Sequence, residues 1–487
     1  MTSSNRVQVA FVRESTPGTT PGTPRMRTAR ITSEGITFTP EYTDPDEIRS
    51  DRMMGDPILQ MQAAQGPISF ELSYPVADTF LSDVIRSAMF NPWSNTPTFD
   101  NDGTADSVVT DAGTTTDTYV VASGGASVVA GHLVRATGFT NAANNQIFRA
   151  ASSTGTTIVG SSLSLTAETA PPAAAKLKVV GFQGASGDIT ATAGGLGSSS
   201  LDFTTLGLAV GQWIKVGGSA TGDKFATAAL NGWARITAIA ANALTLDNKP
   251  SGWTTDAGTS KTIKVWFGDT IKNGTTKTAL SIEKGFLGQD TPTYIVARGM
   301  VAGQLEMSAA SREKLTGTVT FTGMGGGEST TALDASPDAA TTGRVMAGNA
   351  NVGRVAEAGA AVAAKNWAKA LSFTINNNLR TLEAVDDTSP VGIEPGECQV
   401  SGRISTYFGD DTLLAKLYAG TPTSINARFA KDDQAIIWTF PRVTFRGGAP
   451  VAGGKNQDVM LDLDWQSSID TTTNAHVMCD RLEYYEA

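Results

Sequence analysis

The feature that most constrains the fold of this chain is an internal duplication. Each half of the 487-residue sequence contains a strand pattern, a loop, a second strand pattern and an amphipathic helix, in that order. A chain that repeats one order of elements is expected to fold as two related domains. The matching segments are 36–39, 66–74 and 78–81 in the first half, and 371–374, 396–400 and 411–414 in the second.

The two predicted helices are the clearest part of the match. Asp78 and Asp411 stand at the predicted N-cap positions, and Gly420 ends the second helix. Two later hairpins, at 294–322 and 436–465, extend the repeat. The apolar residues that share one 3.6-residue face are Phe80, Leu81, Val84, Ile85, Ala88 and Met89 in the first helix, and Leu413, Leu414, Leu417 and Tyr418 in the second.

An insertion at about 98–275 interrupts the first copy and contains a repeat of its own. Residues 131–138 recur as 211–218, and short alternating runs with Gly and Asn at the turns predict β-strands. The insertion is therefore expected to form two small β-modules, 98–180 and 181–275. Because the second copy has no counterpart, we expect the duplicated fold to form without the insertion.

These patterns predict a mainly β fold, in which two β-sandwich domains each have a flanking helix and two small β-modules are inserted. The alanines of 347–370 favour a helix, while the glycines in the same range allow an extended arm. The predicted ranges are an N-terminal arm at 1–30, the first copy at 31–97 and 276–325, the modules at 98–180 and 181–275, a linker or arm at 326–365, and the second copy at 366–487.

Composition disfavours several classes of function. The formal net charge of −10 argues against a general affinity for nucleic acid, which depends on clustered Lys and Arg. The chain has two histidines, His132 and His476, so metal sites and His-based catalysis are disfavoured. Cys398 and Cys479 are expected to be reduced thiols. No apolar run has the length of a membrane span and the first residues lack a signal-peptide pattern, so we expect folding in a cytosol.

Three patterns suggest chemistry, and each has a simpler structural explanation. The glycines of 323–327 are not followed by the Lys-Ser/Thr of a phosphate-binding loop, so a flexible linker is predicted. Asp462 and Asp464 share one strand face, where a solvated surface competes with a glycosidase-type pair or a cation site. The tryptophans of the insertion offer core packing or a glycan-binding surface; they are Trp213, Trp233 and Trp253. We predict no catalytic, cofactor-binding or metal-binding residue.

With the repeat laid out, the chain resembles the tail tube proteins of siphophages, in the duplicated form of the flagellum-attaching Chi-like phages. Residues 31–97, 276–325 and 366–487 carry the likeness to the family's small β-sandwich with its flanking helix. The loop at 41–65 matches the family's long stacking loop, and its adjacent methionines Met53 and Met54 are expected to lie in the core or at a subunit contact. The resemblance implies a component of the virion tail that is assembled in the host cytoplasm.

The resemblance also implies the assembly and its partners. Single-copy relatives form hexameric rings, so double-copy members are expected to form trimeric rings that stack into a tube. The lumen holds the tape measure protein and later conducts the genomic double-stranded DNA without specific binding. Tail terminator and baseplate proteins meet the ends of the tube, and no membrane or cofactor takes part. The inserted modules resemble surface decorations and are expected on the outside.

Strand alternation predicts which side chains line this lumen. Ile68, Phe70, Leu72 and Tyr74 are expected to pack on the helices, so the side chains between them turn toward the lumen. Hydroxyl groups together with acids hydrate well and repel phosphate, so a duplex slides without being held. The predicted lumen-facing residues are Ser69, Glu71, Ser73, Thr316, Thr318, Thr320, Gln399, Ser401, Arg403, Asp462 and Asp464.

Other classes of protein remain open at the level of sequence. A bacterial surface adhesin or a carbohydrate-binding protein would use the same Thr- and Gly-rich β-modules, although such modules normally follow one another end to end. A polysaccharide-degrading enzyme would use Asp462 or Asp464 as a catalytic carboxyl group. Within phage structure, the alternatives are a capsid decoration protein and a baseplate protein.

Overall fold

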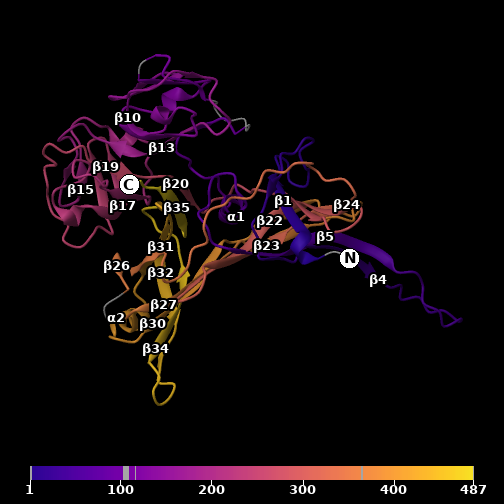
Figure 1. Ribbon diagram of the computed structural model, residues 1–487. Coiled ribbons are helices and arrows are strands. Elements are labelled where there is room, and N and C mark those ends of the chain that lie inside the picture. Colours follow the sequence, from indigo (N-terminus) through magenta and orange to yellow (C-terminus); the bar gives the residue numbers. More distant parts are fainter. Residues whose placement is uncertain (1–2, 103–108, 116, 363–365, 486–487) are drawn as a thin grey trace.

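The structure is a computed structural model that describes residues 3–102, 109–115, 117–362 and 366–485. The described residues are mainly β, as predicted, with two α-helices, α1 (Phe80–Met89) and α2 (Thr412–Ala419). Figure 1 shows the duplicated part as long strands that run through the centre of the molecule, with the inserted segment packed to one side.

Eight strands form the centre of a 19-stranded sheet, and their order repeats. They are β4 (Thr37–Thr43), β5 (Ile58–Glu71), β23 (Thr316–Thr322) and β22 (Thr293–Ala310) in the first half, and β27 (Ala368–Asn376), β30 (Gln399–Tyr407), β34 (Met460–Ser467) and β32 (Gln434–Gly447) in the second. Each strand pairs antiparallel with the next one in this order. The pairing of β22 with β27 makes the two halves one continuous sheet, which we call the central sheet.

A second layer covers one face of the central sheet. The strands β22 and β32 are long enough to belong to both layers. Their amino-terminal parts lie in the second layer, where each pairs with strands from its own half. The order β1-β21-β22-β24 in the first half is matched by β25-β31-β32-β35 in the second. The bounds are β1 (Val7–Arg13), β21 (Leu280–Phe286), β24 (Gly325–Ser329), β25 (Val352–Glu357), β31 (Thr423–Lys431) and β35 (Met478–Glu483).

Short strands complete this part of the fold. They are β2 (Arg27–Thr28) beside β1, β3 (Ser33–Glu34) beside β5, β20 (Asp269–Lys272) beside β35, β26 (Ala360–Ala361) beside β25, β33 (Pro450–Val451) beside β34, and the separate hairpin of β28 (Arg380–Leu382) and β29 (Gly392–Glu394).

One buried apolar cluster fills the space between the layers in both halves. Ile68, Phe70, Leu72 and Tyr74 are all buried in it, as strand alternation predicts. In the second half, four aromatic rings pack in series with centroids 4.7–5.0 Å apart; they are Trp438, Phe373, Phe440 and Trp465. Because both halves share this core, the burial that stabilises one half also stabilises the other.

The helices differ in how deeply they are buried. All six predicted apolar residues of α1 are buried, whereas Leu413 alone is buried in α2 and Tyr418 is 75% exposed. Asp411 is the N-cap of α2 and Gly420 its C-cap, as predicted. The prediction for Asp78 was wrong by one residue, because Thr79 is the N-cap of α1 and Asp78 adopts a left-handed conformation with φ of 57°.

The insertion forms a separate 14-stranded sheet with one buried apolar core. Its two repeats have matching strands, and the antiparallel pairing of β13 with β19 joins them edge to edge. The bounds are β6 (Thr98–Asp100), β7 (Val109–Ala112), β8 (Thr118–Val121), β9 (His132–Thr137), β10 (Ile147–Ser153), β11 (Thr157–Gly160), β12 (Glu168–Thr169), β13 (Lys176–Gln183), β14 (Thr190–Ala191), β15 (Gly195–Gly197), β16 (Trp213–Val216), β17 (Gly232–Ala240), β18 (Ala243–Asp247) and β19 (Lys264–Trp266).

Several segments that the sequence assigns to loops or arms form strands. The predicted arm at 1–30 contains β1, and the predicted linker at 323–327 leads into β24. The helix favoured by the alanines of 347–370 does not form among the described residues of that range, because its first part is β25, the counterpart of β1. The loop at 41–65 includes the ends of β4 and β5, which pair as a hairpin, and its remaining residues, 44–57, form a tip that extends away from the body of the molecule (Figure 1).

Candidate lumen face and its junction with the insertion

The central sheet has one apolar face, which is packed in the core, and one polar face. On β23 the side chains of Val319 and Phe321 are fully buried, while Thr316 and Thr320, on the opposite face of the strand, are exposed. On β34 the alternation is the same, because Leu461, Leu463 and Trp465 are buried and Asp464 is exposed. The alternation predicted from the sequence for these strands is therefore present.

Strand register places the polar side chains in rows that cross six strands. Ser69 and Thr318 are direct neighbours, with their hydroxyl oxygens 3.0 Å apart. The first row contains Ser69, Thr318, Glu306, Thr374, Ser401 and Gln466, and the second contains Glu71, Thr316, Ser308, Ser372, Arg403 and Asp464. The structure thus brings predicted residues from both halves onto one surface, with Thr320 and Gln399 on a third row and Asp462 opposite Ser405.

Sequence reasoning missed the contributions of β22 and β27 to this face. Glu306 and Ser308 alternate with buried Leu305 and Met307, so a two-residue period was available as a signal. Ser73 was wrongly included, because it lies beyond the end of β5 and is 5% exposed. The chain leaves the sheet at Leu72, and alternation no longer determines where the next side chain points.

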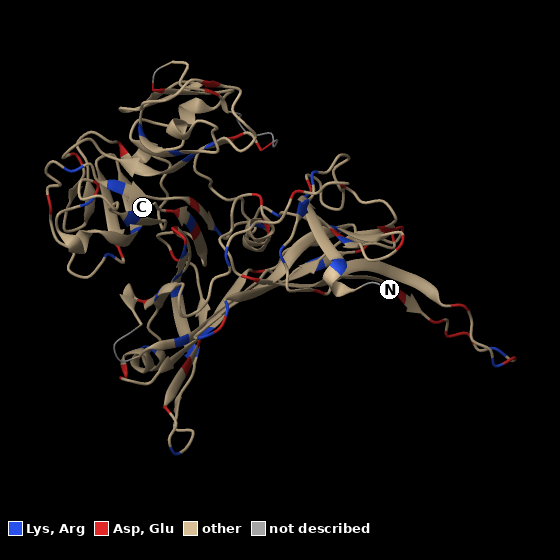
Figure 2. Cartoon of the chain, in the orientation of Figure 1, with Lys and Arg blue, Asp and Glu red and all other residues tan. Residues whose placement is uncertain are grey.

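Opposite charges on the polar face are paired with each other. Arg403 Nε lies 2.9 Å from Asp464 Oδ1, and Lys314 Nζ lies 2.6 Å from Glu71 Oε1 at the end of the neighbouring strands. Figure 2 shows acidic and basic residues together on the strands of the second half. Two of the acids predicted to face the lumen, Glu71 and Asp464, are therefore ion-paired on this face.

Comparison with protein families gives this sheet a biological context. The family model of the phage tail tube protein matches residues 4–261 and, a second time, residues 250–467. The chain belongs to the phage tail tube protein family. Two matches in tandem agree with a duplicated tube domain, and the family is a structural one, which favours a structural role over the adhesin and enzyme alternatives. No curated protein matches the chain.

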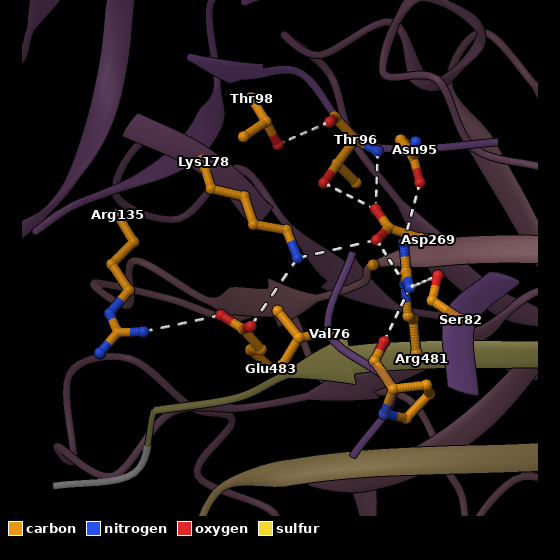
Figure 3. Close-up of polar contacts among 12 residues, drawn as sticks. Val76, Ser82, Asn95, Thr96, Thr98, Arg135, Lys178, Asp269, Arg481 and Glu483 are labelled. Atoms are coloured by element: carbon orange, nitrogen blue, oxygen red, sulfur yellow. Dashed lines mark hydrogen bonds and ion pairs between the residues drawn. The ribbon is translucent and has the colours of Figure 1, made fainter. Parts of the chain in front are cut away.

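A buried charge cluster ties this tail tube protein's insertion to its two halves (Figure 3). Arg481 on β35 and Asp269 on β20 form an ion pair with Nε 2.8 Å from Oδ2, and both side chains are 2% exposed. The guanidinium also donates to Pro75 O and Ser82 Oγ, each at 2.7 Å, which belong to the first half. Arg481 therefore connects the last strand of the second half to the helix of the first.

The insertion contributes two cations to the same cluster. Lys178 Nζ lies 3.7 Å from Asp269 Oδ2 and 3.8 Å from Glu483 Oε1, and Arg135 Nη1 lies 3.6 Å from Glu483 Oε2. Burial alone would raise the pKa of Asp269, but Lys178 and Arg481 hold the pKa below its usual value. The charges compensate one another, as buried ionised groups require.

Apolar contacts extend this junction. One cluster joins residues of the insertion with residues of the second half; its buried members are Leu133, Val180, Trp213 and Trp266, and Ala435, Ile437 and Leu482. Trp213 donates from Nε1 to Thr439 Oγ1 at 2.8 Å, and Trp233 packs edge-on against Tyr484 with centroids 5.3 Å apart. Packing at an interface, rather than glycan contact, is the role of these two tryptophans, while Trp253 packs against the insertion's own core.

The described part of the tube protein gives no sign of a metal centre or a membrane-spanning helix. Within it, no group of three or more His, Cys, Asp and Glu side chains is placed to hold a metal ion. None of its helices is long and apolar enough to cross a membrane. Cys398 and Cys479 are free, as predicted.

The junction predicts a difference between two deletions. Replacing 98–275 by a short Gly/Ser bridge removes Asp269 and leaves Arg481 without its counter-ion, which costs about 3–5 kcal/mol. Replacing 98–266 keeps Asp269, and the bridge between Ser94 and Thr270 holds the cut ends close together. We expect the shorter deletion to unfold at a distinctly higher temperature by circular dichroism. Equal melting temperatures would contradict the role given to the ion pair.

A second prediction concerns Asp480, which is buried between β20 and β32. Desolvation raises the pKa of its carboxyl group to about 7. The folded state therefore holds a proton that the unfolded state releases from about pH 4 upward, and stability is lost as the pH rises toward 7. Asp480→Asn should raise the melting temperature at pH 8 relative to the natural chain and have little effect near pH 4. An equal shift at both pH values would argue against this titration.

Proposed function

We propose that three copies of this tail tube protein form a pseudo-hexameric ring, and that stacked rings conduct the viral genome through a lumen lined by the polar face of the central sheet. The observation that carries the proposal is the β22–β27 joint, which continues one sheet from the first tube domain into the second. A covalently linked pair of equivalent domains needs three chains where single domains need six.

The internal joint supplies a template for the joint between chains. β22 has a bulge between Ala302 and Gln304, and β32 has one between Phe445 and Gly447. When the two bulges are aligned, residues 447–453 correspond to the residues of β22 that pair with β27. When the pairing registers are followed across each half of the sheet, the residues of β27 that pair with β22 correspond to 33–39. A repeat of the joint would pair 447–453 of one chain with 33–39 of the next.

The size of such a ring suits a DNA duplex. Three chains with eight central strands each give roughly 24 strands, which at a spacing of about 4.8 Å and a tilt of about 40° have a circumference near 150 Å. The backbone diameter is then about 48 Å, and inward side chains leave roughly 35–40 Å. A duplex is about 20 Å across, so it fits with solvent around it.

The lining supports passive conduction. Hydroxyl and amide groups dominate the rows of the polar face, and the charges of Arg403 and Asp464 are paired. Such a surface binds water and offers no cluster of free cations to hold phosphates. The tape measure protein would occupy the lumen first and the genomic double-stranded DNA later, with tail terminator and baseplate proteins at the tube ends.

The β4–β5 hairpin supports stacking of rings. Its tip, 44–57, extends away from the body (Figure 1), and Ile48, Met53 and Met54 are between 68% and 103% exposed there. Such exposure excludes the core position considered for Met53 and favours a contact with a neighbouring ring. The hairpin is thus the best candidate for the family's stacking loop.

The position of the insertion supports an outer location. Ile436 and Trp438 of β32 point into the shared core, while Ala435 and Ile437, which alternate with them, point to the insertion. The insertion therefore packs on the side of the second layer that faces away from the central sheet. A lumen on the polar face leaves the inserted modules on the outer surface of the tube.

Symmetry tests the proposed assembly directly. We expect electron microscopy of tubes, with a symmetry determination, to give three chains in each ring and an approximate six-fold repeat of the tube domains. The physical reason is that β22–β27 replaces every second interface of a six-fold ring. A ring of six whole chains would disprove the proposal.

Charge reversal tests the lining. Changing Asp462 and Asp464 together to Lys should leave tubes intact and slow DNA ejection, because inward ammonium groups would hold phosphates. The matched control changes both residues to Asn, which removes the same carboxylates and the ion pair with Arg403 without adding cations. Ejection in phage carrying the control should stay close to normal, and equal ejection rates for both variants would argue against a lumen position.

A further inference from the structure

The two ends of the central sheet differ in what covers them. In the first half, Leu72 donates to Leu315 O at 2.8 Å, and Met346 of the linker lies beside this pair. Met346 donates to Leu72 O at 2.9 Å and accepts from Leu315 N at 3.0 Å. All three side chains are at most 1% exposed, so the linker seals this end of the sheet.

The same linker then crosses the turn that joins β22 to β23. Gly348 donates to Glu313 O at 2.8 Å, and Asn349 Oδ1 accepts from Arg312 N at 2.6 Å and from Ser311 Oγ at 3.1 Å. Further along, Asn351 O accepts from Ala430 N at 2.7 Å as the chain enters β25. The linker is therefore bound to the first half before it becomes part of the second.

The second half repeats the sheet end without the cover. Phe408 donates to Val459 O at 3.0 Å, as Leu72 does to Leu315. The turn between β33 and β34 repeats the left-handed residue, with φ of 63° at Asn456 and 68° at Arg312. Val459, however, is 37% exposed where Leu315 is 1% exposed. The second half thus has the same backbone hydrogen bond at the end of the sheet, but no segment of the described chain covers the apolar side chain of Val459 there.

Strand register identifies the counterpart of the linker. Val352 pairs with Phe429 as Val7 pairs with Phe286, so β25 corresponds to β1. The bond from Leu287 N to Arg6 O, at 3.0 Å, repeats the bond from Ala430 to Asn351. In this alignment of the two halves, Ser3 and Ser4 therefore correspond to Gly348 and Asn349. Met1, which lies outside the described residues, has the sequence position of Met346.

We propose that residues 3–6 of one chain, which precede β1, dock on the turn at 454–459 of the neighbouring chain. This inference rests on the proposed ring. In that ring, the second half of one chain contacts the first half of the next chain in the way that the first half contacts the second half within one chain. Ser4 Oγ would accept from Asn456 N, and Ser3 N would donate to Gln457 O. The occupant comes from a second copy, because β1 and the turn before β34 lie far apart within one chain (Figure 1).

The surface of both partners suits this contact. Residues 3–6 are exposed, and so is every residue from 451 to 459. Tyr407 and Trp367, beside the turn, are 37% and 58% exposed and would be shielded by the docked segment. The N-terminal segment would thus act as the linker that is missing between chains.

Cysteine cross-linking in assembled tubes tests the inference. Ser4→Cys combined with Asn456→Cys should give covalently linked chains on a non-reducing gel after mild oxidation. The matched control combines Ser4→Cys with Arg312→Cys, the same turn position in the first half, where Asn349 already occupies the site. All three positions are exposed, and unchanged circular dichroism melting of the soluble chains would verify that the variants fold.

The outcomes separate this inference from the proposed function. Cross-links between chains for the Asn456 pair and none for the Arg312 pair would support the docking. Rings of three chains without the Asn456 cross-link, or with equal cross-linking of the control, would overturn the docking and leave the ring intact. Rings of six chains would overturn both.

Discussion

The pairing of β22 with β27 is the interaction on which the rest of this structure depends. It turns two sandwich domains into one sheet with a single polar face and lets both halves share one apolar core. Backbone hydrogen bonds set the register, so Glu306 and Ser308 of one half lie beside Thr374 and Ser372 of the other. A relative slip of one residue would turn the polar face inward, and the burial of the core prevents this.

Around this sheet, charge and apolar burial fix the position of the insertion. Arg481 is held by Asp269, by a carbonyl oxygen next to α1 and by a hydroxyl group of α1, so three parts of the chain meet at one guanidinium. Desolvation offsets most of the attraction in an ion pair this deeply buried, so the pair adds little net stability, whereas the loss of one partner leaves an uncompensated buried charge. The apolar contacts of Trp213 and Ile437 supply the burial that holds the junction together.

Local patterns in the sequence predicted much of the fold. The two-residue period of 68–74 and the helical period of 80–89 each place a stripe of apolar side chains on one side of an element, and both stripes are buried. The duplication was also visible, because related strands keep related patterns. The errors have different causes. Ser73 lies just after a strand, where alternation no longer applies, and the glycines of 323–327 give no side-chain pattern that could indicate β24. β1 was missed although Val7, Val9 and Phe11 recur with a two-residue period.

By itself, the sequence determined the mainly β character, the repeat and which face of each strand is apolar, because these follow from side-chain spacing along one strand. The tertiary structure decided which strands are neighbours. Only the pairing of β22 with β27 brings Ser69 and Gln466 into one row, and only the pairing of β20 with β35 brings Asp269 to Arg481. Such contacts join residues that are far apart in the sequence. The choice of neighbouring strand depends on backbone hydrogen bonds and apolar burial, which many strands can provide, so side-chain spacing along one strand does not predict it.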